Sequence, residues 1–482
     1  MSNTKQHFLD LFFYPESVAV VGASRNIMSP NYFLVANLVK LGFPGRVYPV
    51  NPNSEEIMGL KAYPNLRSIP GEVDLAVISV PARATLGVVR DCVAKKVKAI
   101  VIIAGGFSEI GEEGKRIQEE ILTLIRENGI RAVGPNALSP VNTANNFIIG
   151  FGPVEEMPRG GLSFIFQSGL YQPRLNWLLH EFNLRLNKLI DLGNKMDINE
   201  VDALEYLAQD EATKVIAIHL ESIAGDARKF MHLLKETSRE KPVIVLKSGR
   251  TAAGARVASS HTGAIIRSSD TVFDTALRQS GAIRVEGLDE FFDLAKAFEY
   301  LPLPKGNRVA ISSFSGGEGV IATDFSQRYG LTLAELTPET QSRLRRIFPP
   351  WEVPVNPFDI GLATQFHPGE DTIGVLVDAF SQDPNVDCLA IQMTGMNPRV
   401  VDVAFQESAE KLVRLFSQVT SKGKAVVLWL ASSAGGNDSL TKALESSRIP
   451  VYPSAERVVR ALGALCRYAL LRKGASSAIP SW

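Results

Sequence analysis

The sequence has little cysteine and lacks the common metal-binding patterns. Its three cysteines, Cys92, Cys388 and Cys466, lie far apart in the 482 residues and form no CxxC pair. This spacing excludes a disulfide framework and argues against a structural zinc site. The six histidines form neither an HxxxH nor an HExxH pattern, so we expect no metal centre.

An excess of charge and a long apolar run are also absent. Lys and Arg together number 51, as do Asp and Glu, so overall charge does not predict binding to nucleic acid. No stretch approaches the roughly 18 apolar residues that a membrane-spanning helix requires. The N-terminal residues lack the basic start and apolar run of a signal peptide. We therefore expect a cytoplasmic protein.

Short apolar, β-branched runs alternate with amphipathic segments along the chain. The first 145 residues contain five runs of strand length, at residues 17–24, 46–52, 75–81, 99–106 and 131–137. Helical spacing lies between them, at residues 31–42, 84–96 and 111–129. Buried strands that alternate with helices predict a parallel, doubly wound α/β sheet.

The alternation of strand-like and helix-like segments starts again at LSFIFQSG (162–169) and at RVAISSFSGG (308–317), after linkers rich in Gly and Pro. We predict three tandem doubly wound α/β units followed by a short tail. The first is Rossmann-like and the other two are flavodoxin-like. Their expected bounds are residues 1–150, 158–302 and 305–473, and the tail is 474–482.

The turn Gly22-Ala23-Ser24-Arg25 follows the first strand and precedes a helix. Backbone N–H groups at such a turn can bind phosphate. The sequence is not GxGxxG, however, and the second strand ends in Asn51, where NAD enzymes need Asp or Glu. An acid at this position would repel a 3′-phosphorylated nucleotide, so its absence suits CoA. Phosphate binding and a purely structural turn both stay open from these residues.

Several segments, among them VAVVGAS, RVYPVNP, AGGFSEIGEEG and GPNALSP, resemble in order and spacing the CoA-binding domain of ADP-forming acyl-CoA synthetases. These enzymes are relatives of the succinyl-CoA synthetase α subunit, and the resemblance covers nearly the whole chain. Two departures are Asn53, where the family often has a basic residue, and Ala137 and Ser139 after GPN. The resemblance implies CoA contacts at Gly22, Ala23, Ser24, Arg25, Asn51, Pro52, Val80, Pro81, Gly106, Phe107 and Asn136.

Residues 248–270, SGRTAAGARVASSHTGAIIRSSD, predict a loop rich in Gly and Ser that leads to His261. A helix is expected to open directly after it, and a helix N-terminus suits a phosphorylated imidazole. Gln167-Ser168-Gly169 form a second turn between a strand and a helix. A nucleophilic imidazole needs one nitrogen fixed by a partner, and Glu221 is the best candidate. From the residues alone, a single histidine in a polar loop is more often simply exposed than nucleophilic.

Within the same family, SHTGAII resembles the phosphohistidine loop, and HLES resembles the strand whose glutamate orients that histidine. The resemblance implies that His261 is the nucleophile and that Glu221 orients it. His219 shares this strand, and we expect it to point to the opposite face from Glu221. Tyr171 and Pro173 are bulky where the family has small residues, which implies a reshaped acyl pocket or lost activity. The implied phosphate-binding residues are Gln167, Ser168, Gly169, Thr262 and Gly263.

The third unit contains FSGGEGVIATD, a Gly-rich turn that lacks the GKS/T ending of a P-loop, and we interpret its glycines as structural or interfacial. VPVNPFDIG also matches the family, without an assigned role. We find no stretch that resembles an ATP-grasp domain, and phosphoryl transfer to a nucleotide needs Mg²⁺ and a phosphate clamp.

The resemblance therefore implies a hetero-oligomer with an ATP-grasp β subunit that binds ATP or ADP with Mg²⁺. The implied reaction is acyl-CoA + phosphate + ADP ⇌ acid + CoA + ATP, through an acyl phosphate and phospho-His261. Acetate, branched-chain and aryl acids all remain possible substrates. Two alternatives are a non-catalytic CoA-binding sensor or scaffold and a Rossmann oxidoreductase. Asn51 and the missing GxGxxG argue against the second alternative.

Overall fold

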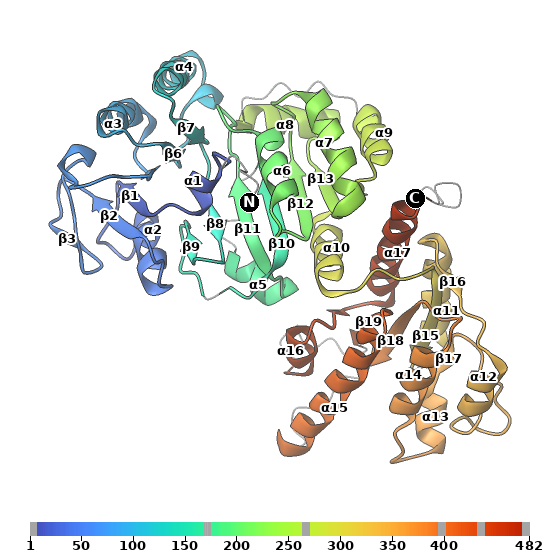
Figure 1. Ribbon diagram of the computed structural model, residues 1–482. Coiled ribbons are helices and arrows are strands. Elements are labelled where there is room, and N and C mark those ends of the chain that lie inside the picture. The colour runs from blue at the N-terminus through green and yellow to red at the C-terminus, as the bar shows by residue number, and fades with distance from the viewer. Residues whose placement is uncertain are drawn as a thin grey trace, which may run out of the picture. The chain divides into compact units, whose positions relative to one another are not determined.

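The structure is a computed structural model that divides into two compact units, Met1–Phe291 and Phe292–Trp482. Each unit is described by itself (Figure 1). In the part of the chain that the structure describes, no helix is long and apolar enough to cross a membrane. The described residues are 7–155, 157–167, 169, 171, 175–262, 270–393, 402–430 and 439–474.

The first sheet has five parallel strands in the order β2-β1-β5-β6-β7. They are β1 (Ser17–Val21), β2 (Arg46–Val50), β5 (Leu75–Ile78), β6 (Ala99–Ile102) and β7 (Arg131–Val133). A small hairpin and two short 3₁₀ turns lie outside the sheet: β3 (Glu56–Ile57), β4 (Leu60–Lys61), η1 (Leu66–Ser68) and η2 (Ser108–Ile110).

Helices cover both faces of this sheet. Val18 and Val20 pack with α2 (Pro30–Lys40) in one cluster. Ala19 and Val21 pack with α3 (Ala82–Lys95) and α4 (Glu112–Glu127) in another. Successive strand residues point to opposite faces, so β1 contributes to two cores. The predicted doubly wound architecture is confirmed for this sheet.

The second sheet has seven strands in the order β14-β13-β12-β10-β11-β8-β9. Five are parallel, and the hairpin β8–β9 pairs antiparallel with β11. The strands are β8 (Val141–Asn142), β9 (Phe147–Ile148), β10 (Arg159–Phe166), β11 (Leu186–Asp191), β12 (Val215–Leu220), β13 (Val243–Lys247) and β14 (Ile283–Val285). The helices are α5 (Leu175–Phe182), α6 (Glu200–Gln209), α7 (Ala227–Glu240), α8 (Ala252–Thr262) and α9 (Asp270–Ser280). The chain therefore changes sheet near residue 141, whereas the sequence placed the boundary at residue 150.

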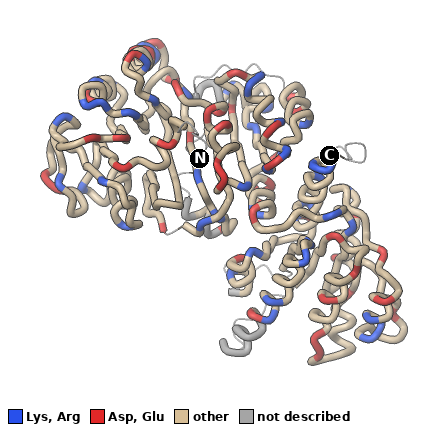
Figure 2. Tube along the Cα trace, in the orientation of Figure 1, with Lys and Arg blue, Asp and Glu red and all other residues tan. Residues whose placement is uncertain are grey.

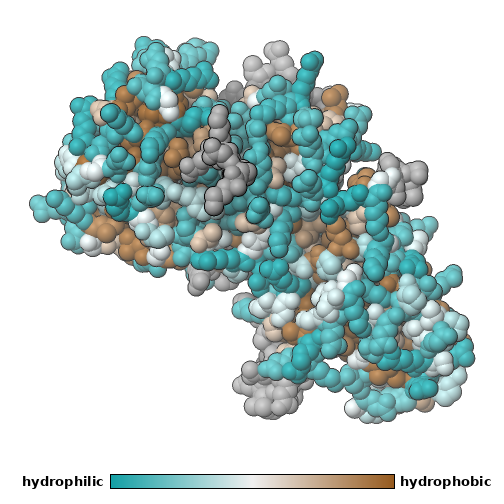
Figure 3. All heavy atoms as spheres, viewed as in Figure 1, coloured by the Kyte–Doolittle hydropathy of each residue, from teal (hydrophilic) through white to brown (hydrophobic). Residues whose placement is uncertain are grey.

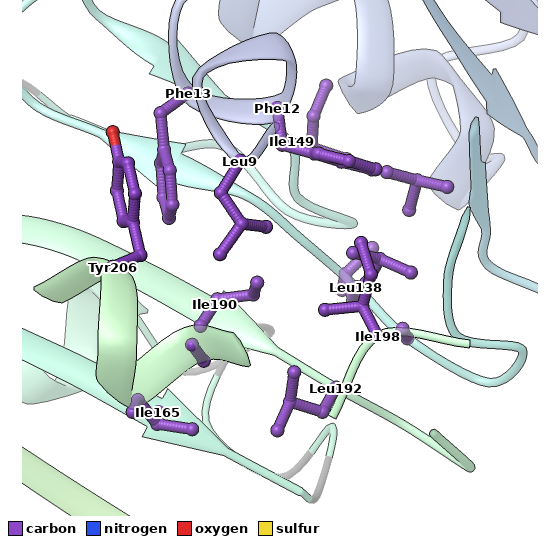
Figure 4. Packing of buried hydrophobic residues seen from close by; sticks show 14 of the residues in the cluster. Leu9, Phe12, Phe13, Leu138, Ile149, Ile165, Ile190, Leu192, Ile198 and Tyr206 are labelled. Carbon is purple, nitrogen blue, oxygen red and sulfur yellow. The ribbon is translucent and has the colours of Figure 1, made fainter. Parts of the chain in front are cut away.

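The N-terminal helix α1 (Asp10–Phe13) joins the two sheets into one unit. Figure 4 shows Phe13 beside Tyr206, Leu9 over Ile190 and Phe12 next to Ile149. All of these residues belong to one hydrophobic cluster. The Tyr206 hydroxyl donates to the Asp10 carboxylate at 2.8 Å, and the Asn142 amide donates to the Phe13 carbonyl at 2.9 Å. Because this core is continuous, residues 1–291 are compact as a whole.

The second unit contains a six-stranded parallel sheet in the order β16-β15-β18-β19-β20, with β17 paired to β15. Its strands are β15 (Arg308–Ser313), β16 (Thr332–Leu333), β17 (Phe358–Asp359), β18 (Cys388–Met393), β19 (Ala425–Leu430) and β20 (Val451–Tyr452). Its helices are α11 (Gly316–Arg328), α12 (Pro338–Leu344), α13 (Ile360–Phe366), α14 (Thr372–Gln382), α15 (Asp402–Ser421), α16 (Ser439–Ser446) and α17 (Ala455–Arg472).

Helix α10 (Leu288–Tyr300) contains the division between the two units. Its buried Lys296 donates to the Glu445 carboxylate at 2.6 Å, and Arg457 donates to both carboxylate oxygens of Asp293 at 2.6 Å. These contacts place the helix from Phe292 onward in the second unit. The sequence had placed it at the end of the 158–302 unit.

The sequence assigned no role to the VPVNPFDIG motif. In the structure its Asn356 forms hydrogen bonds with the backbone of β15. The Asn356 amide donates to the carbonyls of Val309 at 2.8 Å and Ala334 at 3.1 Å, and its oxygen accepts from Ile311 N at 2.9 Å. A Cβ at Gly319, in the first part of α11, would lie 3.1 Å from Pro357. This close contact supports the structural interpretation for Gly319.

Charged residues of both signs are interspersed over the helices of each unit (Figure 2). The face shown in Figure 3 is mostly hydrophilic, with hydrophobic residues in scattered patches. This pattern agrees with the equal numbers of acidic and basic residues.

Candidate active site

The five segments that resemble a CoA site lie at one edge of the first sheet, here called the first edge. Gly22 follows β1, Asn51 follows β2, Val80 lies beyond β5, Gly106 beyond β6 and Asn136 beyond β7. In a parallel sheet the carboxyl ends of the strands lie together, and ligands bind in the crevice outside them. The tertiary structure thus brings all five together.

The turn after β1 is built to allow close approach of the backbone. Gly22 has φ +87°, and a Cβ there would overlap the carbonyl oxygen of Ser79. The Asn31 amide donates to Gly22 O at 2.8 Å and to Ser79 O at 3.1 Å. The Asn51 amide donates to Ala23 O at 2.7 Å. These bonds fix a turn that leaves no room for a side chain at Gly22.

Most of the predicted CoA contacts are accessible in the structure. Helix α2 begins at Pro30, so the turn itself is not the helix N-terminus. The side chains of Ala23 and Phe107 are fully buried, so only their backbones can face a ligand. The accessible positions are Gly22, Ser24, Arg25, Asn51, Pro52, Val80, Pro81, Gly106 and Asn136.

The first edge meets the second sheet at Glu109. One carboxylate oxygen of Glu109 accepts from Gly106 N at 2.6 Å, and the other accepts from the Asn194 amide at 2.8 Å. Asn194 lies in the loop after β11. In the same loop Gly193 has φ +54°, and a Cβ there would overlap the Pro135 carbonyl. The loops of the two sheets are therefore in direct contact.

Asp191, at the end of β11, has a fully buried carboxyl group at this junction. It accepts from Leu138 N at 2.9 Å and from Gly193 N at 3.2 Å. Burial raises the pKa of Asp191 to about 7, and the charge of Glu221 acts in the same direction. A Cβ at Gly169 would lie 3.8 Å from Asp191 Oδ2, so the Gln167-Ser168-Gly169 turn adjoins this carboxyl.

Gln167 holds the turn that carries Glu221. Its buried Oε1 accepts from Glu221 N at 2.8 Å, Ser222 N at 3.0 Å and Lys195 Nζ at 3.0 Å. Its Nε2 donates to Ser222 Oγ at 3.0 Å. Because these groups occupy the side chain, Gln167 positions the 221–222 turn. This role differs from the phosphate contact that the resemblance implied.

A buried ion pair between Lys195 and Glu200 stabilises this turn. Lys195 Nζ donates to Glu200 Oε2 at 2.9 Å and to Ser222 O at 2.6 Å, and the two charged side chains are 2% and 0% exposed. Glu200 Oε1 accepts from Ala224 N and Gly225 N, each at 2.8 Å. Burial lowers the pKa of Lys195, while Glu200 counteracts this effect. Sequence reasoning missed this pair, because nothing in its local pattern distinguishes it from surface charges.

Glu221 lies just beyond β12 and is 9% exposed. Lys247 Nζ donates to the Glu221 carbonyl at 2.9 Å. Burial raises the pKa of Tyr171, and the charge of Glu221 acts in the same direction. The Tyr171 hydroxyl also lies 3.0 Å from His219 Nδ1, so His219 and Glu221 are near the same phenol. The expectation that His219 points away from Glu221 does not follow from the strand period, because residues two apart in a strand share a face.

The segment before His261 is helical. Helix α8 spans Ala252–Thr262, and Thr251 Oγ1 accepts from Gly254 N at 3.0 Å at its start. The prediction of a loop before His261 was wrong, because His261 lies within α8. The helix expected to open after it falls on residues from Gly263 on, which lie outside the described part of the chain, and the description resumes with α9 at Asp270. The alanines at the start of the segment explain this, because alanine has the highest helix propensity.

Helix α8 contacts η2, the short turn that carries Glu109. The backbone of His261 therefore belongs to a helix that lies against the first edge. The side chains of His261 and Thr262 lie outside the described residues, as do Ser168, Gly263 and Pro173. Gly169 is described and exposed.

Three family models together match most of the chain. A CoA binding domain matches residues 16–142. A succinyl-CoA ligase like flavodoxin domain matches residues 159–298, and a Ligase-CoA domain matches residues 309–477.

Full-length relatives show the same similarity. The chain is 37% identical over 469 residues to acetate–CoA ligase [ADP-forming] II subunit alpha of Pyrococcus furiosus, covering 96% of this chain and 98% of the relative. It is 36% identical to acetate–CoA ligase [ADP-forming] II of Archaeoglobus fulgidus, covering 95% of this chain and 67% of that longer protein. The solved structure of Ca. Korarchaeum cryptofilum dinucleotide forming acetyl-coenzyme A synthetase 1 in complex with phosphate and ADP matches 98% of this chain and 99% of its own. That match has a TM-score of 0.85 and 32% identity.

Proposed function

Because the chain belongs to the family of ADP-forming acetate–CoA ligase alpha subunits, we propose that it binds CoA and carries a phosphoryl group on His261. The reaction is acyl-CoA + phosphate + ADP ⇌ acid + CoA + ATP. The observation that carries the proposal is the fixed position of Glu221, held by Gln167 and Lys247 beside the loops of the first edge.

The first edge supplies the CoA site in this proposal. Backbone groups near Gly22 and Gly106 can approach a phosphate closely, because neither position has a side chain in the way. Arg25 is exposed beside the turn and supplies a positive charge. Asn51 holds the turn without adding a negative charge that would repel the CoA phosphates.

Three bond exchanges make up the reaction. Phosphate attacks the acyl carbonyl, the thioester bond breaks, and CoA leaves as the thiol with an acyl phosphate as product. His261 Nε2 then attacks phosphorus, and the acyl carboxylate leaves. Finally the phosphoryl group passes from His261 to ADP, which forms ATP and restores the imidazole.

Glu221 acts on the other nitrogen of the His261 ring in this scheme. By accepting its N–H, the carboxylate fixes the tautomer and stabilises the ring as it gains positive charge. The Lys195–Glu200 pair keeps Gln167 and hence the Glu221 backbone in place. Backbone N–H groups near Gly169 stabilise the oxyanions.

A second subunit completes the cycle in this proposal. The relative of nearly equal length is named as subunit alpha, and the Archaeoglobus relative is about half as long again. We propose that an ATP-grasp β subunit binds ADP or ATP with Mg²⁺ and that the two chains form a hetero-oligomer. The three cysteines are free thiols, which supports a reducing, cytoplasmic location.

Intact-mass analysis tests the proposal. The purified chain is incubated with phosphate and acetyl-CoA, isobutyryl-CoA or phenylacetyl-CoA, without nucleotide. We expect an acid-labile phosphoryl adduct that is absent in His261→Asn and reduced at least about 100-fold in Glu221→Gln. His232→Asn, an exposed histidine on α7, is the matched control and keeps the adduct.

The absence of a phosphoryl adduct would contradict the proposal. If CoA binds but no acyl-CoA gives an adduct, with or without the ATP-grasp partner, the proposed reaction is wrong. The chain would then be a non-catalytic CoA-binding sensor or scaffold.

A further inference from the structure

Tyr171, His219 and Ser248 connect three neighbouring strands at the carboxyl edge of the second sheet. Tyr171 lies in the segment after β10, His219 is in β12, and Ser248 directly follows β13. These strands are adjacent in the order β13-β12-β10. His219 therefore sits between two segments that are far apart in the sequence.

The three side chains form a continuous contact, in which Tyr171 and His219 are buried and Ser248 is half-buried. The Tyr171 hydroxyl lies 3.0 Å from His219 Nδ1, and Ser248 Oγ lies 2.5 Å from His219 Nε2. The Tyr171 ring stacks on Phe166 with centroids 3.8 Å apart and meets the His219 ring edge-on at 5.4 Å. Tyr171 is 2% exposed and His219 is 5% exposed. Both nitrogens of the imidazole are thus used for protein contacts.

The contact is neutral at physiological pH. Burial lowers the pKa of His219 to about 4, and the charge of Lys247 acts in the same direction. Burial also raises the pKa of Tyr171, with a further contribution from Glu221, so the phenol keeps its proton. A neutral imidazole has one donor and one acceptor nitrogen, which matches one hydroxyl on each side. The arrangement adds no charge beside Glu221.

Ser248 is also fixed to the strand that precedes Glu221. Its N–H donates to Leu220 O at 2.9 Å. Lys247 Nζ donates to the carbonyls of both Glu221 and Ser248. Helix α8, which contains His261, begins four residues later at Ala252. Only three residues separate Ser248 from this helix, so the position of Ser248 limits where the helix can start.

We propose that Tyr171, His219 and Ser248 are positioning residues that align helix α8 with the Gln167-Ser168-Gly169 turn for phosphoryl transfer to His261. The inference rests on the proposed function. It gives a role to Tyr171, the bulky residue that departs from the family pattern, and to His219, which the sequence left without one. Displacement of reacting groups by about 1 Å can cost about 100-fold in rate, so a small loss of alignment is measurable.

The test compares two tyrosine variants in the full chain. Tyr171→Phe keeps the ring and its stacking on Phe166 but removes the hydroxyl next to His219. Tyr206→Phe is the matched control, since Tyr206 is 7% exposed and its hydroxyl donates to Asp10 at 2.8 Å, away from the site. The single-turnover rate of adduct formation is measured with phosphate and the most reactive of the three acyl-CoAs, alongside the Kd for CoA.

We expect Tyr171→Phe and Ser248→Ala each to slow adduct formation at least about 10-fold, with the Kd for CoA changed less than about 2-fold. Ser248→Thr keeps the hydroxyl and restores the rate to within about 3-fold of the unaltered chain. The double variant Tyr171→Phe/Ser248→Ala is no slower than the slower single variant, because both break one connection.

Two outcomes separate this inference from the proposed function. If the unaltered chain forms the adduct and Tyr171→Phe forms it as fast as Tyr206→Phe, the positioning role is wrong and the proposed function stands. If the unaltered chain forms no adduct with any acyl-CoA or with the partner present, both are overturned.

Discussion

The carboxyl edges of the first and second sheets have the same topology and different chemistry. At the first edge, Gly22 and Gly106 have positive φ angles and the turn is held by neutral amide–carbonyl bonds. At the second edge, Lys195 and Glu200 form an ion pair that is almost fully buried, and Asp191 is also buried. The first edge presents backbone to solvent, and the second holds charged side chains inside the protein.

This difference suits the first edge to binding a ligand and the second edge to holding reactive side chains in place. Backbone N–H groups suit the phosphates of a large ligand such as CoA, because they are fixed by the turn and carry no net charge. A nucleophilic histidine needs a carboxylate in one place and one charge state, which a buried, fully hydrogen-bonded network provides. Changes at the second edge should therefore reduce both stability and reactivity. Changes at the first edge should reduce mainly CoA affinity.

Lys195→Met should give the largest loss of stability, and it should also reduce phosphoenzyme formation. It therefore tests the role of buried charge at the second edge most directly. Removal of one partner leaves the Glu200 carboxylate buried and uncompensated, which typically costs about 3–5 kcal/mol. We expect a large fall in the urea unfolding midpoint of the compact unit and a fall of at least about 10-fold in phosphoenzyme formation. Lys229→Met is the control, because its pair with Glu205 is half exposed and such pairs contribute at most about 1 kcal/mol. Equal midpoints for the two variants would show that the buried pair does not support the second edge.

Gly22→Ala should give the next largest effect, confined to CoA binding. The new Cβ would overlap Ser79 O and take an unfavourable positive φ, so the turn must move. We expect the Kd for CoA to rise at least about 10-fold, measured by titration calorimetry. Gly71→Ala has nearly the same backbone strain, with φ +85° and no atom within 4 Å of the new Cβ, and should bind CoA normally. A similar loss of affinity in both variants would mean that strain, not close approach, determines binding at the first edge.

Asp191→Asn should change how the stability of the fold depends on pH. The folded pKa of Asp191 is about 7, above its ordinary value of 3.8. Its contribution to stability is thus fully present below pH about 4 and is lost as pH rises through about 7, by about 1.4 kcal/mol per unit of pKa difference. Asn does not titrate, so the stability of the unaltered chain relative to Asp191→Asn should fall between about pH 4 and pH 7 and then level off. Calorimetric melting temperatures at four pH values test this. A constant difference would show that Asp191 is ionised throughout and that the second edge tolerates an extra buried charge.

The sequence predicted most of the first edge because its features are local. Gly22 directly follows a strand with a clear apolar pattern, and Asn51 ends the next strand. Parallel topology then places both at one edge without further information. Glu221 and His261 came from the family resemblance, and the helix around His261 was missed although Thr251 and the alanines after it are a good helix start.

The second edge was largely missed because its contacts join residues that are far apart along the chain. Lys195 reaches Gln167 and Ser222, and His219 reaches Tyr171 and Ser248. The spacing of these residues does not indicate that they meet. For His219 the strand period itself was applied wrongly, which hid its place beside Tyr171.

The sequence by itself determined the α/β class, the three sheets, and the edge where CoA is proposed to bind, because apolar periodicity and turn glycines act over a few residues. Only the tertiary structure decided that the first two sheets share one core through α1 and the β8–β9 hairpin. It also decided which charged residues are buried together around Glu221. Burial raises the pKa of Asp191 and lowers the pKa values of Lys195 and His219. Burial depends on packing from all sides of a residue, and a local sequence pattern carries no information about that packing.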